Sequence, residues 1–179
     1  KAERAAIYWG DETAVAEDGH WLRAYAPAGQ TPILAAPSKR HGLSMVSAIS
    51  NQGLVRFEFI EEAMNTDLFI GFMERLLADS SQKVFLILDN LKVHHAKLVT
   101  SWLAERQDRI EVFYLPPYSP EINPDEYLNR DFKTVLRSSD RASSKKALLQ
   151  KATTFMQFLA RTPERVMAYF KHSPVRYAA

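Results

Sequence analysis

The spacing of hydrophobic residues changes several times along this chain, and the first third of the chain has the spacing of β-strands. The apolar run 5–10 predicts a short buried strand that delivers Asp11 at its C-terminal end. Segments 43–49 and 54–60 flank the turn at 50–53, and apolar and polar residues alternate in the second segment. Such alternation is typical of an antiparallel hairpin with one buried face. A further short strand is expected over 21–26, followed by a loop rich in Pro and Gly over 27–37.

From Thr66 onward, helical and strand patterns alternate. Apolar residues at helical spacing predict a helix over 66–78, with Asn65 or Thr66 as its N-cap. The unbroken apolar run 84–88 predicts a strand buried on both faces, which ends abruptly at Asp89. The same reasoning predicts an amphipathic helix with Leu98, Val99, Trp102 and Leu103 on its buried side, and a strand over 110–115.

Beyond this strand the chain is expected to be helical. The proline-rich loop 116–120 leads to a third helix, capped by Asn123 with Pro124 in its first turn. Glu126 lies in that first turn. Two more helices are expected over 143–160 and 163–171, with Ser143 and Thr162 as their caps and Pro163 at the first helical position of the second.

The order of these elements predicts an α/β fold. An antiparallel hairpin leads into parallel β-α-β units, which gives a mixed sheet with helices on both faces. With 179 residues, of which 46% are hydrophobic, the chain has the size of one domain. We expect a core over about 5–137 and C-terminal helices within 143–171. In such sheets, functional sites collect at the carboxyl ends of the strands.

Composition excludes some classes of site and leaves others open. The chain has no cysteine, which rules out disulfides and thiolate metal ligands and is compatible with a reducing compartment, so a cytoplasmic setting is expected. No apolar run reaches the length needed to span a bilayer. A net charge of +2 permits nucleic-acid binding without indicating it. The chain opens on Lys1 and soon reaches an apolar strand, so a preceding domain is expected to be missing.

Three carboxylates occupy positions where chemistry is common. Asp11 and Asp89 end two strands, and Glu126 begins a helix. If the strands are neighbours, the acids would converge and repel one another unless cations lie between them, and oxygen ligands favour Mg²⁺ or Mn²⁺. Acids are also common at strand ends and in first helical turns, where they stabilise the helix dipole. Glu12, Asp125 and Asp131 compete for the same roles, and spacing does not separate them from their neighbours.

Two longer strings are more specific. One runs from Phe85 through Asp89-Asn90 to His94, and the other runs from Leu115-Pro-Pro-Tyr-Ser-Pro through Asn-Pro-Asp-Glu126 to Lys133. Together they resemble the mariner-like superfamily of DDE transposases, in particular its bacterial insertion-sequence branch with a DDE superfamily endonuclease domain. Trp-Gly-Asp-Glu12 and the segment 26–32 are similar to the strand and loop that carry the first acid of this family. The resemblance covers about 7–137.

The resemblance implies a ribonuclease H-like fold in which Asp11, Asp89 and Glu126 bind two Mg²⁺ or Mn²⁺ ions. Members cut double-stranded DNA at transposon ends with activated water and join the 3′-hydroxyl to target DNA, usually at a TA dinucleotide. The full-length protein would also carry an N-terminal DNA-binding domain, absent here, and could act as a homodimer. The chain departs from the common pattern at Asn129, where tryptophan is frequent, which puts the local packing or the subgroup in question.

Secondary candidates have two interpretations each. Asn90 and His94 belong to the string around Asp89 and would orient a metal-bound water or touch a phosphate, or His94 is simply a helix-start residue near the surface. A basic stripe of Lys133, Arg137 and Arg141 would bind the DNA backbone, or it is a solvated helix face. Tyr118 would stack on an extruded base, or it pins its loop to the core.

The function expected from the sequence is therefore that of a transposase catalytic domain. A nuclease of the same fold that does not transfer strands is a second hypothesis. A third is a domesticated or inactive relative that binds DNA without cutting it. The presence of all three acids argues against the third hypothesis, because the loss of an acid is the expected mark of decay.

Overall fold

The computed structural model describes residues 5–16, 27–29, 41–61, 63–138 and 142–179. In this part of the chain, one mixed sheet of five strands has the order β3-β2-β1-β4-β5. β1 pairs antiparallel with β2, and β2 antiparallel with β3, whereas β4 lies parallel to both β1 and β5. The strands are β1 (Ala5–Ala16), β2 (Gly42–Ile49), β3 (Val55–Ile60), β4 (Lys83–Leu88) and β5 (Ile110–Tyr114).

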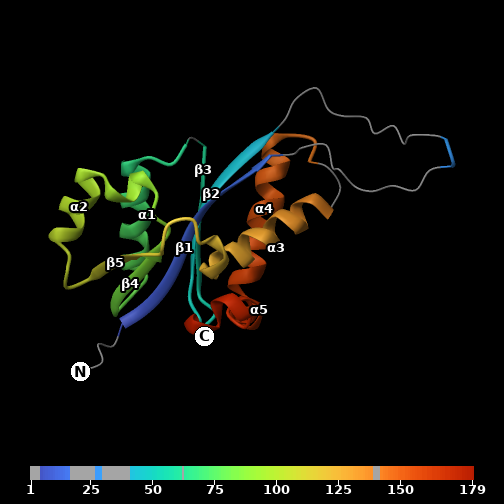
Figure 1. The fold of residues 1–179 in the computed structure, drawn as a ribbon. Coiled ribbons are helices and arrows are strands. Elements are labelled where there is room, and N and C mark those ends of the chain that lie inside the picture. The colour runs from blue at the N-terminus through green and yellow to red at the C-terminus, as the bar shows by residue number, and fades with distance from the viewer. Residues whose placement is uncertain (1–4, 17–26, 30–40, 62, 139–141) are drawn as a thin grey trace.

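Helices cover both faces of the sheet, as predicted (Figure 1). The α-helices are α1 (Thr66–Ala78), α2 (Lys97–Ala104), α3 (Asp125–Ser138), α4 (Lys145–Ala160) and α5 (Pro163–Tyr169). Three short 3-10 helices accompany them: η1 (Lys92–His95), η2 (Pro120–Ile122) and η3 (Ser173–Ala178). None of the helices in the described ranges is both long and apolar enough to cross a membrane.

Two hydrophobic cores, one on each face, follow from the alternation of the strands. Tyr8 of β1 packs in the core beneath α1 and α2, whereas its neighbour Trp9 packs in the core beneath α3, α4 and α5. Because successive strand residues point to opposite faces, a single strand supplies both cores. Burial of this apolar surface is the main force that holds the helices on the sheet.

Several local predictions are confirmed. The hairpin of β2 and β3 has the expected pairing, and Gly53 in its turn has a φ of 87°, which favours glycine. A Cβ on Gly53 would lie 2.5 Å from Cβ of Pro163, because the turn packs against the start of α5. Asn65, one of the two proposed caps of α1, accepts a hydrogen bond from the Leu68 N–H at 3.0 Å.

Other predictions are wrong in detail. Ser144 rather than Ser143 caps α4, since its hydroxyl accepts from the Ala147 N–H at 3.1 Å. Thr162 precedes α5, but its hydroxyl donates backward to the Phe158 carbonyl instead of capping. Leu98 is 63% exposed, so α2 buries a narrower stripe than expected. β4 is fully buried on one face only, because Phe85 and Ile87 keep intermediate exposure. The strand expected over 21–26 and most of the loop 27–37 lie outside the described residues.

The end of the chain folds back onto the sheet, which the sequence did not predict. The hydroxyl of Tyr177 in η3 donates to the Ile122 carbonyl at 2.8 Å, and the Trp9 indole donates to the Tyr177 oxygen at 3.3 Å. The Asn51 side chain donates to the Ala178 carbonyl at 3.0 Å. The C-terminal segment therefore ties the hairpin turn and η2 to β1.

Candidate active site

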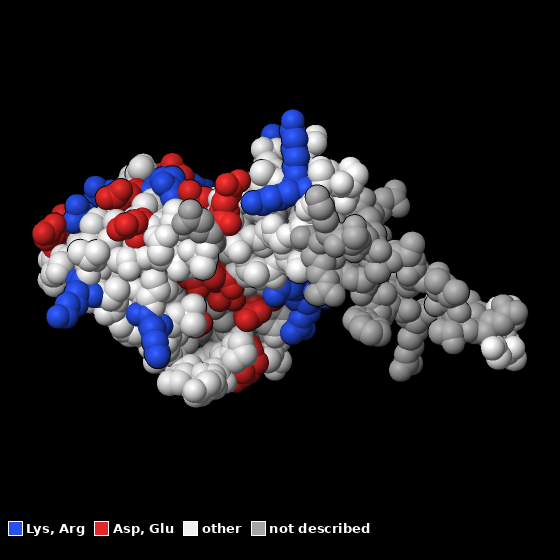
Figure 2. All heavy atoms as spheres, turned by 90° about the horizontal axis from the view of Figure 1, so that it is seen from above, with Lys and Arg blue, Asp and Glu red and all other residues white. Residues whose placement is uncertain are grey.

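A cleft opens at the edge of the sheet where the parallel strands end. The pairing of β1 with β4 stops at Trp9 and Ile87, but β1 continues along β2 to Ala16. A hollow of about 780 Å³ lies beside this extension, lined by Asp11, Asp89, Asn90, Leu91, Lys92, Leu115, Pro116, Pro117, Tyr118, Ser119, Pro120, Asn123 and Glu126. Figure 2 looks down on this end of the molecule and shows acidic side chains gathered in a central hollow. All three carboxylates singled out from the sequence line the cleft.

Asp11 lies inside β1 rather than at its end, which corrects the prediction from the sequence. It faces Ser47 across the β1–β2 ladder, and pairing with β2 carries the strand beyond it. Asp11 is 8% exposed, and both of its oxygens accept hydrogen bonds. The Glu12 N–H donates to Oδ1 at 2.9 Å, and the Asn129 side-chain amide donates to Oδ2 at 2.8 Å.

Glu126 reaches the cleft because the start of α3 is tied to β1. The side chain of Asn123 donates to the Gly10 carbonyl at 3.1 Å, and its oxygen accepts from the Asp125 N–H at 3.1 Å, as expected of a cap. Both groups of one buried amide are thus used, one on each element. The first turn of α3, with Glu126, is thereby held beside Asp11.

The electrostatics of the cleft favour a bound cation. Burial, and after it the charges of neighbouring acids, together raise the pKa of Asp11 to about 9; these neighbours are Asp125, Glu126, Glu12 and Asp89. Burial and Glu12 likewise raise the pKa of Asp89, against the opposing effect of His94. Carboxyl groups that resist ionisation in one cleft ionise readily when a cation lies between them.

Three buried carboxylate oxygens also accept no hydrogen bond among the described residues. They are Oδ1 of Asp89, which lies 3.5 Å from Nδ1 of His94, Oε2 of Glu12, and Oδ1 of Asp125, which lies outside the cleft. Buried polar atoms are nearly always satisfied, so unpaired oxygens in an acidic site point to an absent positive partner. The donor set fits a hard divalent cation, because the acids of the cleft offer carboxylate oxygens.

The structure also separates the three competing acids that the sequence left open. Asp125 is fully buried and accepts from the Ser47 hydroxyl at 2.6 Å; its burial raises its pKa to about 8. It therefore has no access to the cleft. Asp131 lies on the side of α3 that packs against α5, where Arg165 donates two hydrogen bonds of 2.8 Å to it. Asp131 is thus neutralised by a cation of the protein itself.

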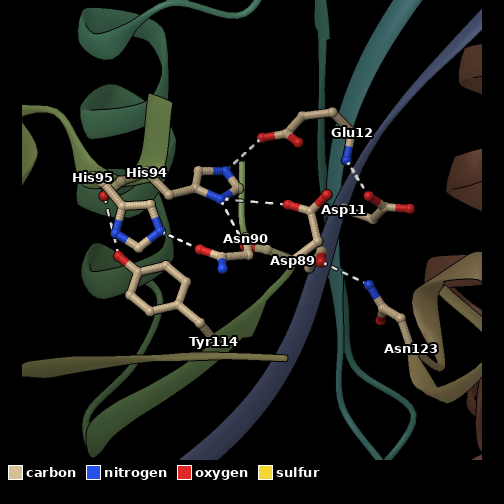
Figure 3. A network of polar contacts seen from close by, with 9 residues as sticks. Asp11, Glu12, Asp89, Asn90, His94, His95, Tyr114 and Asn123 are labelled. Atoms are coloured by element: carbon tan, nitrogen blue, oxygen red, sulfur yellow. Dashed lines mark hydrogen bonds and ion pairs between the residues drawn. The ribbon is translucent and has the colours of Figure 1, made fainter. Parts of the chain in front are cut away.

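Glu12, the third competitor, points to the opposite face of β1 from Asp11 (Figure 3). Its Oε1 lies 2.9 Å from Nε2 of His94, whose Nδ1 lies 3.1 Å from the Asp89 carbonyl oxygen and 3.5 Å from the Asp89 carboxylate. One ligand atom from each of these three residues lies within 4.8 Å of the others, so they form a second group that could hold a metal ion. Both groups of acids share Asp89.

His94 is 1% exposed, which excludes a position near the surface. Its ring packs 4.6 Å from that of Phe69, and both of its nitrogens face oxygens of Glu12 and Asp89. Burial lowers its pKa, but the hydrogen bond to Glu12 and the neighbouring acids outweigh this and leave the pKa raised. His94 thus connects β1 to the residue that follows β4. The sequence did not reveal its partnership with Glu12, although strand alternation could have shown that Glu12 points away from Asp11.

Asn90 also lines the cleft, at the edge of the same network. Its side-chain oxygen contacts Nε2 of His95, whose ring packs 4.3 Å from that of Tyr114. The sequence assigned no role to His95. The amide is exposed, so it remains accessible to a ligand in the cleft.

A smaller groove beside the cleft carries positive charge. Its volume is about 220 Å³, and it is lined by Glu126, Arg130, Lys133, Thr134 and Arg137 of α3. Lys133 and Arg137 belong to the basic stripe considered from the sequence, whereas Arg141 lies outside the described residues. Arg130 was missed, although its position one helical turn after Glu126 could have indicated it.

Comparison with known proteins agrees with this geometry. The family model described as DDE superfamily endonuclease matches residues 6–149. The chain belongs to this family. Its DDE endonuclease domain has the acids Asp11, Asp89 and Glu126 within the matched region.

Among curated proteins, the Shigella sonnei insertion element IS630 uncharacterized 39 kDa protein is 33% identical over 98 residues. The match covers 54% of this chain and 28% of that relative, so the chain corresponds to a fraction of the relative's length. The DDE endonuclease is also similar to a solved Mos1 transposase paired-end complex with left transposon end. This match has a TM-score of 0.68 and 18% identity, over 97% of this chain and 55% of that chain.

The catalytic domain of Mos1 mariner transposase gives a TM-score of 0.60 at 16% identity, over 97% of this chain and 82% of that chain. At such low identity the likeness concerns the fold. It establishes the ribonuclease H-like architecture that the resemblance in sequence implied. The expected α/β class, the mixed sheet and the helices on both faces are therefore confirmed.

Proposed function

We propose that this chain is the catalytic domain of a DNA transposase, with Asp11, Asp89 and Glu126 as the ligands of two Mg²⁺ or Mn²⁺ ions. The observation that carries the proposal is that one cleft of about 780 Å³ is lined by all three acids. Asp11 comes from β1, Asp89 follows β4, and Glu126 lies in the first turn of α3. Sites in open α/β sheets form at this carboxyl edge.

Each residue of the cleft has a defined task in this proposal. Bound divalent ions would activate the attacking oxygen and stabilise the leaving oxygen of a phosphodiester. Asp11, Asp89 and Glu126 hold the ions, and Asn123 fixes Glu126 beside β1. His94 contacts the backbone carbonyl of Asp89 and thereby orients the backbone that carries this acid. Its other ring nitrogen binds the Glu12 carboxylate on the side of β1 away from Asp11.

Cleavage would proceed by attack of water on the phosphorus and departure of the 3′-oxygen as a hydroxyl. That 3′-hydroxyl would then attack a phosphodiester of the target, with loss of the target's own 3′-oxygen. No covalent bond to the protein is required. TA dinucleotides as the target and a homodimer in the full-length protein are part of the proposal.

The substrate is double-stranded DNA, the transposon end and then the target. The groove beside Glu126 offers Arg130, Lys133 and Arg137 to the phosphate backbone. Basic side chains next to an acidic cleft would hold the DNA strand while the scissile phosphate lies near the acids. Solved Mos1 structures similar in fold include a strand transfer complex and paired-end complexes with Mn and with Mg.

The alternative is a relative that binds DNA without cutting it. The arrangement of the acids favours the active enzyme, since inactivation would have removed the pressure to keep three buried or half-buried carboxylates together. Such a cluster is unfavourable for folding unless a cation neutralises it, so its retention points to a function that needs the cation. The chemistry of the acids alone would also allow a nuclease without strand transfer, which the assay below detects as cutting without joining.

The test is Mn²⁺ binding by calorimetry together with nicking of supercoiled DNA. It compares the unmodified chain with Asp89→Asn, which removes a ligand, and with Asp131→Asn, which removes an acid of α3 that lies outside the cleft. We expect binding and nicking to be lost in Asp89→Asn and kept in Asp131→Asn. Joining of a pre-cut DNA end to a plasmid then tests strand transfer.

The outcomes separate the hypotheses. Binding that is lost with Asp89, without any nicking by the unmodified chain, would support the relative that does not cut. Binding that survives in Asp89→Asn, or no binding by the unmodified chain, would refute the metal site.

A further inference from the structure

Asn129 is an unusual residue for its place in the fold. It lies in the interior of α3, is 1% exposed and belongs to the same helix as the core residues Leu128 and Phe132. A buried amide is costly unless it is fully hydrogen-bonded, and a leucine would fill such a position without that cost. The polar side chain therefore requires an explanation.

The contacts of Asn129 supply one. Its Nδ2 donates to Oδ2 of Asp11 at 2.8 Å, while its own Oδ1 has no partner among the described residues. The side chain thus leaves its acceptor unsatisfied and uses its donor on a carboxylate. The hydrogen bond to Asp11 is therefore what asparagine provides at this position and an apolar residue would not.

The second donor to Asp11 makes the geometry specific. The Glu12 N–H donates to Oδ1 and the Asn129 amide donates to Oδ2, so each oxygen of the carboxylate has its own donor. Each oxygen keeps further lone-pair directions for a cation. An amide orients the carboxylate without a positive charge, whereas Lys or Arg here would compete with a metal ion. No Lys or Arg forms an ion pair with Asp11 in the described part of the chain.

Asn129 also joins the two elements that carry the acids. It follows Glu126 by three positions, so both residues lie on the same side of α3. The bond to Asp11 therefore sets the distance between the acid of β1 and the acid of α3. Hydrogen bonds to metal ligands commonly tune affinity in this way.

We propose that Asn129 is a positioning residue that holds Asp11 in the orientation needed to bind a divalent cation together with Glu126. This inference rests on the proposed function. It also accounts for the asparagine at a position where tryptophan is frequent in the family, because the side chain here serves the acid rather than the packing alone.

The test compares Asn129→Leu with Asn129→Gln and with Ser47→Ala. Leucine keeps the approximate size and removes the donor; glutamine keeps an amide donor on a longer side chain. Ser47→Ala is the matched control, because it also removes a buried hydrogen bond to a carboxylate. That carboxylate belongs to Asp125, which does not line the cleft. Mn²⁺ affinity is measured by titration with electron paramagnetic resonance, and thermal stability is measured without metal.

We expect Asn129→Leu to weaken Mn²⁺ binding by about 10- to 100-fold. Its thermal stability without metal should change little, because removal of the unpaired Oδ1 of Asn129 offsets the loss of the donor to Oδ2 of Asp11. Glutamine should recover part of the affinity, and Ser47→Ala should bind Mn²⁺ like the unmodified chain. The nicking rate of Asn129→Leu at saturating Mn²⁺ should approach that of the unmodified chain, since the defect lies in binding.

Two results would overturn the inference. If Asn129→Leu binds Mn²⁺ as tightly as the unmodified chain while Asp89→Asn does not bind it, Asn129 has no positioning role and the proposed function stands. If Asn129→Leu and Ser47→Ala lose affinity equally, the effect is a general loss of packing. Absence of Mn²⁺ binding by the unmodified chain would remove the proposed function and this inference together.

Discussion

Replacing Asp11 by asparagine is predicted to stabilise the metal-free chain while it abolishes metal binding. Asp11 is buried among other acids, and its pKa is raised to about 9 from an ordinary value of 3.8. Asparagine has nearly the same shape but no charge. Its oxygen can still accept from the Glu12 N–H. The amide of Asn129 can rotate so that its unpaired Oδ1 accepts from the new amide.

The sign follows from proton linkage. The folded chain holds the Asp11 proton more tightly than the unfolded chain, so folding stability falls as the pH rises from the unfolded value toward about 9. Each pKa unit corresponds to about 1.36 kcal/mol, and pH 7 lies about three units above the unfolded value, so the penalty at neutral pH is at most about 4 kcal/mol. Relaxation of the cleft reduces this, and we expect a gain of about 1–4 kcal/mol for Asp11→Asn.

The assay is urea unfolding from about pH 5 to about pH 9 in the presence of a chelator, repeated with Mg²⁺. The stability of the unmodified chain should fall with pH more steeply than that of Asp11→Asn. Mg²⁺ should then stabilise the unmodified chain, by about 2.7 kcal/mol at 100 times its dissociation constant, and leave the variant unchanged. A variant that is less stable than the unmodified chain at high pH, or that keeps the same pH dependence, would refute the reasoning.

Three further predictions concern residues outside the acid cluster. Asp131→Asn should destabilise the chain by about 1–2 kcal/mol at neutral pH, because it removes the bidentate pair with Arg165. Burial opposes ionisation of Asp131, but Arg165 and Tyr169 outweigh burial and lower the pKa of Asp131. The stability that the ion pair contributes should therefore disappear as the pH falls below the ordinary range of aspartate. An Asp131→Asn variant whose acid unfolding coincides with that of the unmodified chain would contradict this. Lys133→Gln should weaken binding to all DNA sequences and reduce the slope of log affinity against log salt by about 0.9, whereas an unchanged slope would place Lys133 off the DNA. Tyr118 is fully exposed at the cleft, which excludes a role in pinning its loop to the core. Tyr118→Ala should weaken binding to DNA with an unpaired base by about tenfold and weaken binding to fully paired DNA less. Equal effects on the two DNAs would exclude base stacking.

Elements specified by neighbouring residues were predictable from the sequence. The hairpin around Gly53, the cap of α1 at Asn65 and the start of α3 at Asn123 all depend on contacts within a few residues. The length of β1 was not predictable in this way. Its second half contains Asp11, Glu12 and Thr13, whose polarity suggests a loop, and it is a strand because it pairs with β2 about thirty residues later.

The same distinction between local and distant contacts applies to the candidate site. The positions of the three acids could be proposed from motif spacing, but their neighbours could not. The bond from Asn129 to Asp11 spans 118 positions, and that from His94 to Glu12 spans 82. Periodicity carries no information about such distant pairs. The departure at Asn129 from the family pattern was the one sign in the sequence that this position has a special environment.

Adjacent residues of β1 point to opposite faces, and this alternation joins the two halves of the site. Asp11 faces α3, where Asn129 holds it, and Glu12 faces η1, where His94 holds it. Asp89 lies between them, with its carboxylate in the cleft and its carbonyl bonded to His94. The strand therefore fixes α3 and η1 relative to each other through a single pair of neighbouring acids. Because Asp11 is buried among other acids, it destabilises the metal-free fold, and a cation bound in the cleft would reverse this effect. Addition of the metal ion should accordingly make this edge of the sheet more rigid.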